Sequence, residues 1–241
     1  ALVALLAAAG IGGLWAWTPD LDRAELEARY GAPPSEFVVV DGLRLHLRDS
    51  APDGAPDGRP AVLLLHGFGG SLHTWDGWAE ALAQRHRVLR IDLPGAALTG
   101  PEPNDDYSDE RALRLLSALL DARGIERATV VGHSMGGRIA WRFAAAQPAR
   151  VERLVLIAPD GFPSPGFEIG KPPEVPAAAQ WLPRALPRPV VRAALAAAWG
   201  DPARLDEATV TRHHELLLAP GVRAAMLARL RQLVPADPVP L

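Results

Sequence analysis

The feature that most constrains the fold of this chain is a G-x-S-x-G motif at residues 132–136, which read GHSMG. An apolar, β-branched run, 128–131, directly precedes the motif, and a helical pattern over 138–146 follows it. A strand, a sharp turn and a helix in this order present a serine hydroxyl on strained backbone, where it can act as a nucleophile. A glycine-rich turn that happens to hold a serine is the alternative. The pattern favours the first interpretation, with Ser134 as the nucleophile.

A second glycine-rich motif lies upstream. The run AVLLL at 61–65 is apolar throughout, which is typical of a buried strand, and it leads into HGFGG at 66–70. Glycines let backbone N–H groups approach a ligand closely, and an oxyanion hole needs two such donors. We predict that these donors are the amides of Phe68 and Met135. The residues expected to support the two motifs are His66, Gly67, Gly132, His133 and Gly136.

In combination, these motifs resemble the α/β-hydrolase superfamily. The matching segments are HGFGGSLHTW at 66–75, IDLPG at 91–95, GHSMGG at 132–137 and VERLVLIAP at 151–159. The resemblance covers roughly residues 36–241 and implies a mostly parallel sheet with helices on both faces and a helical cap. The chain looks most like the branch of single-domain esterases, lipases and C–C-bond hydrolases, because epoxide hydrolases and haloalkane dehalogenases carry an aspartate in place of Ser134.

Strand and helix patterns alternate through the predicted core, residues 36–162, as expected of a parallel sheet. A proline-rich stretch and several alanine- and leucine-rich helices then fill 163–234, which the resemblance implies is a cap over the serine. Residues 235–241 resemble the lead-in to further core strands. The predicted strands are 37–40, 43–48, 61–65, 88–92 and 153–158, and the predicted helices are 75–84, 108–123, 177–186, 188–199, 204–218 and 221–233.

The catalytic acid and base are harder to find. The superfamily's triad runs serine, acid, histidine, and the resemblance implies that the acid and the histidine follow the seventh and eighth strands. Since the sequence stops at Leu241, we expect a piece of a longer protein that lacks its last strands and its catalytic histidine, with the sixth strand as an unpaired edge. Asp160, after the sixth strand, is a candidate acid, and a turn residue is the alternative reading.

Histidines inside the chain are weaker candidates for the base. His73 should lie near the cavity and is the best of them, whereas the side chain of His133 should point back into the fold. We expect His213 and His214 to be solvated on a polar helix. His46 and His86 resemble surface or strand residues.

The first 17 residues carry no charge, and they end in a pair of tryptophans before Thr18. A membrane span needs about 20 apolar residues, and tryptophan suits the membrane interface. We therefore predict a single-pass N-terminal membrane anchor at 1–19, followed by a connecting helix and linker at 20–35. A cleaved signal peptide and a buried helix are the alternatives, and the sequence leaves the side of the membrane open.

The composition limits which classes of function and partner we expect. A chain of 241 residues that is 49% hydrophobic and 22% charged can bury a sizeable core. Its net charge of −3 is spread without a basic stripe, so we expect no nucleic-acid partner. The chain has no cysteine and no cluster of metal-ligand residues, so we predict neither a metal nor a cofactor.

Together, the motifs predict a serine hydrolase that cleaves a small-molecule ester or a related carbonyl compound through an acyl-enzyme. Two alternatives stay open. One is a cofactor-free C–C hydrolase or perhydrolase on the same scaffold. The other is a non-catalytic binding or receptor protein with the hydrolase fold.

Overall fold

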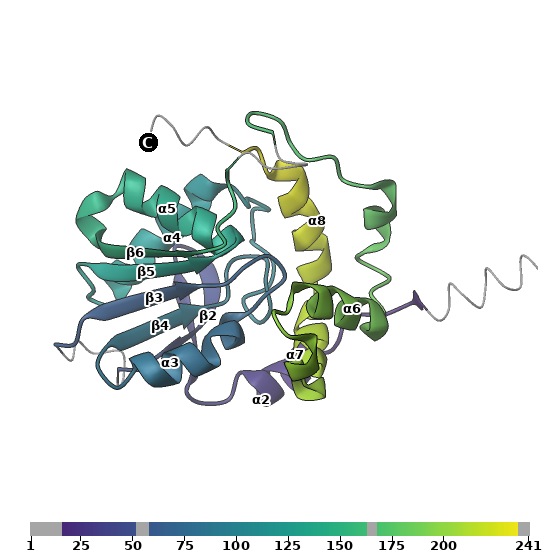
Figure 1. Ribbon diagram of the computed structural model, residues 1–241, viewed down its shortest axis with the longest axis horizontal. Coiled ribbons are helices and arrows are strands. Elements are labelled where there is room, and N and C mark those ends of the chain that lie inside the picture. Colours follow the sequence, from purple (N-terminus) through teal and green to yellow (C-terminus); the bar gives the residue numbers. More distant parts are fainter. Residues whose placement is uncertain (1–15, 52–57, 163–167, 236–241) are drawn as a thin grey trace, which may run out of the picture.

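The computed structural model describes residues 16–51, 58–162 and 168–235. Its centre is a six-stranded sheet in the order β1-β2-β4-β3-β5-β6, flanked by helices (Figure 1). This architecture confirms the predicted α/β-hydrolase fold class. The strands are β1 (Ser35–Val40), β2 (Leu43–Asp49), β3 (Ala61–Leu65), β4 (Arg87–Ile91), β5 (Ala128–His133) and β6 (Val151–Ile157).

The sheet begins with an antiparallel hairpin and continues with parallel strands. Asp41 and Gly42 join β1 to β2 with positive φ angles of 47° and 78°, as the predicted two-residue turn requires. β3 pairs in parallel with both β4 and β5, and Leu65 lies opposite Gly132. The carboxyl ends of these strands therefore meet at one edge, where open α/β sheets bind ligands.

Helices cover both faces of the sheet (Figure 1). α4 (Asp109–Ala122) and α5 (Met135–Ala146) lie on one face, and α3 (Asp76–Leu82) lies on the other. The hydroxyl of Ser108 caps α4 by accepting from the Arg111 amide at 3.2 Å. Leucines of α4 pack with Phe143 of α5 and the buried strands in the main core, and each buried leucine stabilises the fold by about 1.5–3 kcal/mol.

In the described residues 168–235, the cap contains three helices and two short 3₁₀ turns. The helices are α6 (Arg188–Ala198), α7 (Glu207–Leu217) and α8 (Val222–Gln232), and the turns are η4 (Ala177–Trp181) and η5 (Pro202–Arg204). The helix predicted at 177–186 is wrong beyond this first turn. Pro183 and Pro187 cannot continue a helix, because proline lacks an N–H group and clashes with the preceding turn.

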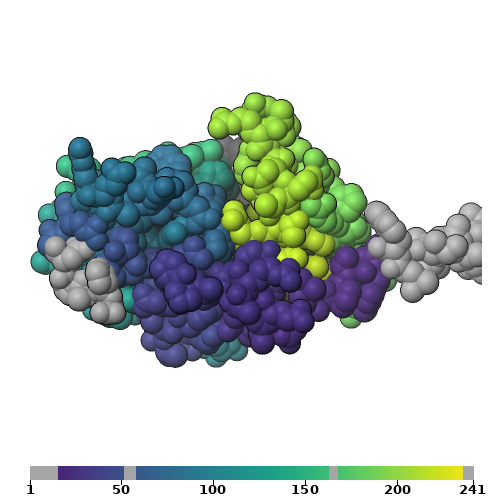
Figure 2. Space-filling view, turned by 90° about the horizontal axis from the view of Figure 1, so that it is seen from below, coloured from purple at the N-terminus to yellow at the C-terminus, as the bar shows by residue number. Residues whose placement is uncertain are grey.

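The predicted linker is a packed part of the molecule. Residues 16–31, with α2 (Arg23–Tyr30), lie along the underside and contact both the core and the cap (Figure 2). Leu26 packs with Leu98 of the core and Leu216 of the cap. The Tyr30 hydroxyl donates to Glu215 of α7 at 2.6 Å. This segment thus joins the two halves of the molecule.

The predicted localisation, a single-pass membrane anchor, is contradicted. Across residues 16–51, 58–162 and 168–235, no helix is both long enough and apolar enough to cross a bilayer. The last residues of the predicted anchor contact the cap instead: Trp17 bridges to Ala185, and the Thr18 amide donates to the Arg184 carbonyl at 2.9 Å. Residues 1–15, which carried most of that prediction, lie outside the described residues.

Strand β6 is an edge of the sheet. Among the strands that the structure describes it pairs only with β5, and Leu154, Val155 and Leu156 are 38%, 39% and 37% exposed. Apolar strands with unpaired N–H and C=O groups are prone to pair with further strands.

Candidate active site

Ser134 occupies the turn between β5 and α5. Its backbone has φ 52° and ψ −120°, a conformation that costs a residue with a β-carbon about 1–3 kcal/mol. Hydrogen bonds hold it there. The Ser134 amide donates to the Ile157 carbonyl at 3.1 Å, and its own carbonyl accepts from the amides of Asp160 at 3.1 Å and Arg138 at 3.0 Å. The ends of β6 and α5 therefore maintain the strained turn.

The glycines on either side of the serine fit only because they lack side chains. A β-carbon on Gly132 would overlap the carbonyl of Gly136, and one on Gly136 would overlap the carbonyl of Leu65. Both obstacles are backbone atoms of neighbouring elements, which cannot move aside cheaply. The close packing of β3, β5 and α5 thus requires both glycines.

The loop after β3 runs directly beside the serine. A β-carbon built on Gly67 would lie 3.2 Å from the β-carbon of Ser134 and 3.0 Å from Nδ1 of His133. Phe68 and Met135 line one small cavity beside this loop. Within the described chain, neither of their amides donates a hydrogen bond. Both residues thus lie next to the Ser134 turn in the chain or in space: Met135 follows the serine directly, and Phe68 follows Gly67, which approaches the β-carbon of Ser134.

His66 anchors this loop. The ring is fully buried, and its Nε2 accepts from the Leu93 amide at 2.9 Å. The proton therefore sits on Nδ1, which donates to the Gly67 carbonyl at 2.8 Å. Burial lowers the pKa of His66, so the ring stays neutral. Its position fits a structural role.

Asp92, at the end of β4, organises the next loop. Its buried carboxylate accepts from the Leu72 amide at 2.7 Å and the Leu98 amide at 3.0 Å, and it pairs with Nδ1 of His46 at 2.6 Å. Burial acts to raise the pKa of Asp92, but the His46 ring and these hydrogen bonds lower it overall. His46 lies on β2, as a strand residue, yet it is completely buried rather than on the surface.

Asp160 forms an ion pair rather than a dyad with a histidine. Its carboxylate lies 2.9 Å from Nε of Arg138, a buried residue of α5. Burial raises the pKa of Asp160, and the Arg138 charge offsets part of that effect. In the described part of the chain, no histidine contacts this carboxylate. The geometry therefore gives the predicted role of triad acid no support.

A cavity of about 640 Å³ lies between the loop after β3, which is the expected oxyanion loop, and the cap. Clefts of this size suit small organic molecules. His133 lines this cavity, although we expected its ring to point back into the fold. α7 contributes Thr209, Arg212 and His213, which share one helical face. α6 contributes an apolar face made of Val190, Val191, Ala194, Leu195 and Ala198.

Two expectations about histidines of the cap are wrong. His213 and His214 are half-buried rather than solvated: His213 lines the cavity, and burial lowers its pKa to about 4. His214 hydrogen-bonds the Leu186 carbonyl at 2.8 Å through Nε2. The helical spacing 209, 212, 213, 216, 217 was the signal that His213 lies on the inward face of α7.

His73 does lie in the cavity wall, with Nδ1 3.5 Å from Oδ2 of Asp76. In the described residues, however, no histidine nitrogen forms a hydrogen bond with the Ser134 hydroxyl. The same residues hold no group of three His, Cys, Asp or Glu side chains arranged to bind a metal ion.

Comparison with known proteins places this geometry in a family. Residues 60–239 match the family model for the alpha/beta hydrolase fold. An uncharacterized protein of Mycobacterium tuberculosis is 39% identical over 131 residues, which are 54% of this chain and 36% of that protein. A 2-hydroxy-6-oxononadienedioate/2-hydroxy-6-oxononatrienedioate hydrolase of Cupriavidus pinatubonensis is 36% identical over 56% of this chain and 48% of its own length. The chain thus spans less than half of these curated relatives.

Solved structures match a larger share of this chain than the curated relatives do. A hydrolase from Pseudomonas aeruginosa superimposes with a TM-score of 0.63 at 27% identity, over 84% of this chain and 74% of its own. A meta-cleavage product hydrolase from Pseudomonas fluorescens gives a TM-score of 0.67 at 23% identity, over 84% and 72% of the two chains. With the family model matching most of its length, this chain belongs to the α/β-hydrolase family.

Proposed function

We propose that the protein is a serine hydrolase that cleaves a small-molecule ester or a related carbonyl compound. Ser134 attacks the carbonyl carbon, and the amides of Phe68 and Met135 stabilise the oxyanion. The proton of the Ser134 hydroxyl passes to the leaving group, which departs as the free alcohol and leaves an acyl-enzyme; water then hydrolyses the acyl-enzyme to the acid and restores the Ser134 hydroxyl. The observation that carries this proposal is the strained Ser134 backbone, held beside two amides that donate to nothing else in the described chain.

The strain itself supports catalysis over mere binding. The backbone conformation of Ser134, with φ 52°, lowers the stability of the fold. Gly132 and Gly136 are required because a β-carbon at either position would overlap backbone atoms around this turn. A binding protein gains nothing from this conformation. We assign the base to none of the described histidines, because none bonds to the Ser134 hydroxyl.

The cavity supports a substrate with an apolar part. The face of α6 that lines it is aliphatic from Val190 to Ala198, so an acyl or alkyl group would lose water on binding there. Polar side chains of α7 and His73 line the other side. Such a site fits an ester with one apolar and one hydrogen-bonding end.

A cofactor-free C–C hydrolase is the second candidate. It is favoured by the relative from Cupriavidus pinatubonensis, whose name gives a 2-hydroxy-6-oxo diacid as substrate. Comparing kcat/KM for p-nitrophenyl esters with kcat/KM for a 2-hydroxy-6-oxo-dienoate would separate the two candidates. The serine is the nucleophile or proton relay in both, so Ser134→Ala does not distinguish them.

A fluorophosphonate probe tests the proposal directly. Wild-type protein should be labelled at Ser134, and Ser134→Ala should lose the label together with at least about 10⁴-fold in kcat. Ser71→Ala is a matched control, since Ser71 is a buried serine of the same cavity wall, and it should keep the label. The experiment uses the full-length protein, and a folded full-length wild type that takes no label would support the non-catalytic alternative.

A further inference from the structure

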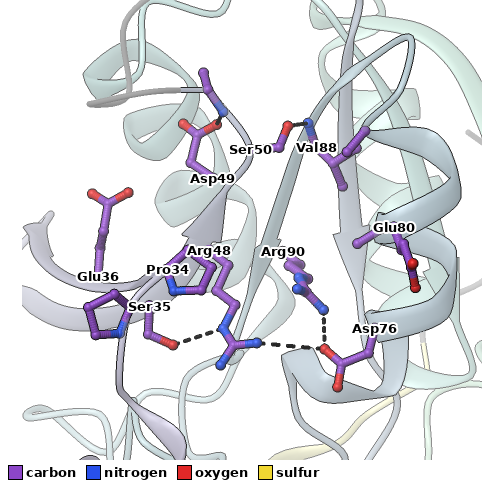
Figure 3. A pocket seen from close by; sticks show the side chains of 14 residues that line it. Pro34, Ser35, Glu36, Arg48, Asp49, Ser50, Asp76, Glu80, Val88 and Arg90 are labelled. Carbon is purple, nitrogen blue, oxygen red and sulfur yellow. Dashed lines mark hydrogen bonds and ion pairs between the residues drawn. The ribbon is translucent and has the colours of Figure 1, made fainter.

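A second cavity, of about 870 Å³, lies away from Ser134. It is bordered by the segment before β1, the end of β2, β4 and α3 (Figure 3). Neither the oxyanion loop nor the catalytic turn contributes to its wall. We call this cavity the α3 groove, and nothing in the hydrolase chemistry uses it.

The floor of the α3 groove carries two guanidinium groups. Arg48 of β2 and Arg90 of β4 both reach Asp76 of α3, Arg48 at 3.8 Å and Arg90 through a hydrogen bond (Figure 3). Their side chains are only 18% and 12% exposed. Charged groups this far from water are normally matched by partners of opposite charge.

The positive charges around Asp76 outnumber the negative charge that they share. Arg212 of the cap approaches the same carboxylate at 3.5 Å, so three guanidinium groups share Asp76. Burial and the neighbouring Arg90 charge lower the pKa of Arg48, while Asp76 acts in the opposite direction. The cluster therefore has an excess of positive charge.

Other carboxylates of the groove do not supply the missing charge. Asp49 is held by Arg87 at 2.7 Å, and Glu36 by Arg123 at 2.9 Å. Glu80 stands on the exposed rim, with no ion pair among the described residues. Arg48 and Arg90 are thus the cations of the groove lining that share a single carboxylate, that of Asp76.

We propose that the α3 groove binds a small organic anion, a carboxylate or a phosphate, through Arg48 and Arg90. Guanidinium groups present a planar fork of N–H donors that matches either oxyanion. The fork of Arg48 is already oriented, because its Nε donates to the Ser35 hydroxyl at 2.9 Å. The volume leaves room for an organic body behind the anion. This site is independent of the proposed hydrolase activity.

Calorimetry with inorganic phosphate and with citrate tests the proposal, using the Ser134→Ala protein and chloride at matched ionic strength as the reference. Saturable binding is expected, with a Kd on the order of 1 mM or tighter. Arg48→Met and Arg90→Met should each weaken binding at least about tenfold. Arg44→Met is the matched control: Arg44 also lies on β2, but it pairs with Glu27 at 2.7 Å outside the groove, and binding should be unchanged.

Glu80→Gln keeps the test valid should the arginine variants fail to fold. Removing this rim carboxylate should tighten phosphate binding by about twofold or more, since a like charge is lost. Absence of saturable binding beyond chloride overturns the proposal, as does an equal loss in Arg44→Met and Arg48→Met. Because Ser134 labelling is measured separately, either result leaves the hydrolase proposal untouched.

Discussion

The two walls of the candidate active site are built in different ways. On the core side, close packing sets the geometry: a β-carbon on Gly132 would overlap the Gly136 carbonyl, and one on Gly67 would lie 3.2 Å from the β-carbon of Ser134. On the cap side, helical side chains such as Leu195 and His213 line the cavity. Substitutions at the glycines of the core wall should therefore disrupt the fold. Single side chains of the cap wall, in contrast, can be replaced while the fold is kept. We therefore expect reaction chemistry to depend on the first wall and substrate choice to depend on the second.

The largest effect is expected at the glycines of the turn. Gly132→Ala or Gly136→Ala should destabilise the fold by roughly 3 kcal/mol or more and abolish probe labelling, because each new methyl group meets backbone atoms. Urea unfolding measures the loss. Gly77→Ala is the control, since nothing lies within 4 Å of its added carbon, and it should gain about 0.5–1 kcal/mol in α3. Equal stability of all three variants would contradict the difference between the walls.

The next effect concerns the oxyanion. Phe68→Pro removes the amide N–H and should lower kcat by about 10²–10³-fold with a smaller change in KM. Phe68→Ala keeps the amide and removes a side chain that is 40% exposed, so its kcat should stay within severalfold of wild type. Steady-state kinetics on one ester gives both values. A Phe68→Ala protein as slow as Phe68→Pro would assign the effect to the side chain instead.

Changes to the cap wall should alter selectivity rather than chemistry. Leu195→Trp fills part of the 640 Å³ cavity and should lower kcat/KM for long acyl esters about tenfold relative to acetate. A series of p-nitrophenyl esters measures the shift. Labelling of Ser134 by a small fluorophosphonate should be unchanged, and a loss of labelling would show that the cap also positions the nucleophile.

The smallest effect is a pH dependence of stability. The pKa of His213 falls from its ordinary value of 6.5 to about 4 on folding, chiefly through burial. Between these values the unfolded chain binds the extra proton, so stability should decrease as pH falls from 6.5 towards 4. His213→Gln should make the urea midpoint less sensitive to pH across this window. Part of the slope should remain, because burial also lowers the pKa of His66. An unchanged slope would mean that His213 is hydrated.

Much of the core wall could be predicted from sequence, because its determinants are local. The strand at 61–65 has the expected bounds, and α4 is capped by Ser108 as the pattern indicated. The turn at Ser134 follows from the spacing of two glycines. In each case, neighbouring residues in the chain contain the physical reason for the structure.

The cap wall depends on contacts between distant segments. His213 faces the cavity because α6 and α7 fold against the core, and Asp76 gathers Arg48, Arg90 and Arg212 from three different elements. Residues 16–19 illustrate the same limit. The tryptophan at 17 was expected at a membrane interface, yet Trp17 pairs with Ala185 of the cap. Composition alone does not tell which apolar surface a segment will meet.

A crystal structure of the phosphonylated protein would test the central claim most directly. The label should be bonded to Oγ of Ser134, with the phosphonyl oxygen about 2.7–3.1 Å from the amide nitrogens of both Phe68 and Met135. A label on another residue, or a phosphonyl oxygen turned away from both amides, would contradict the account.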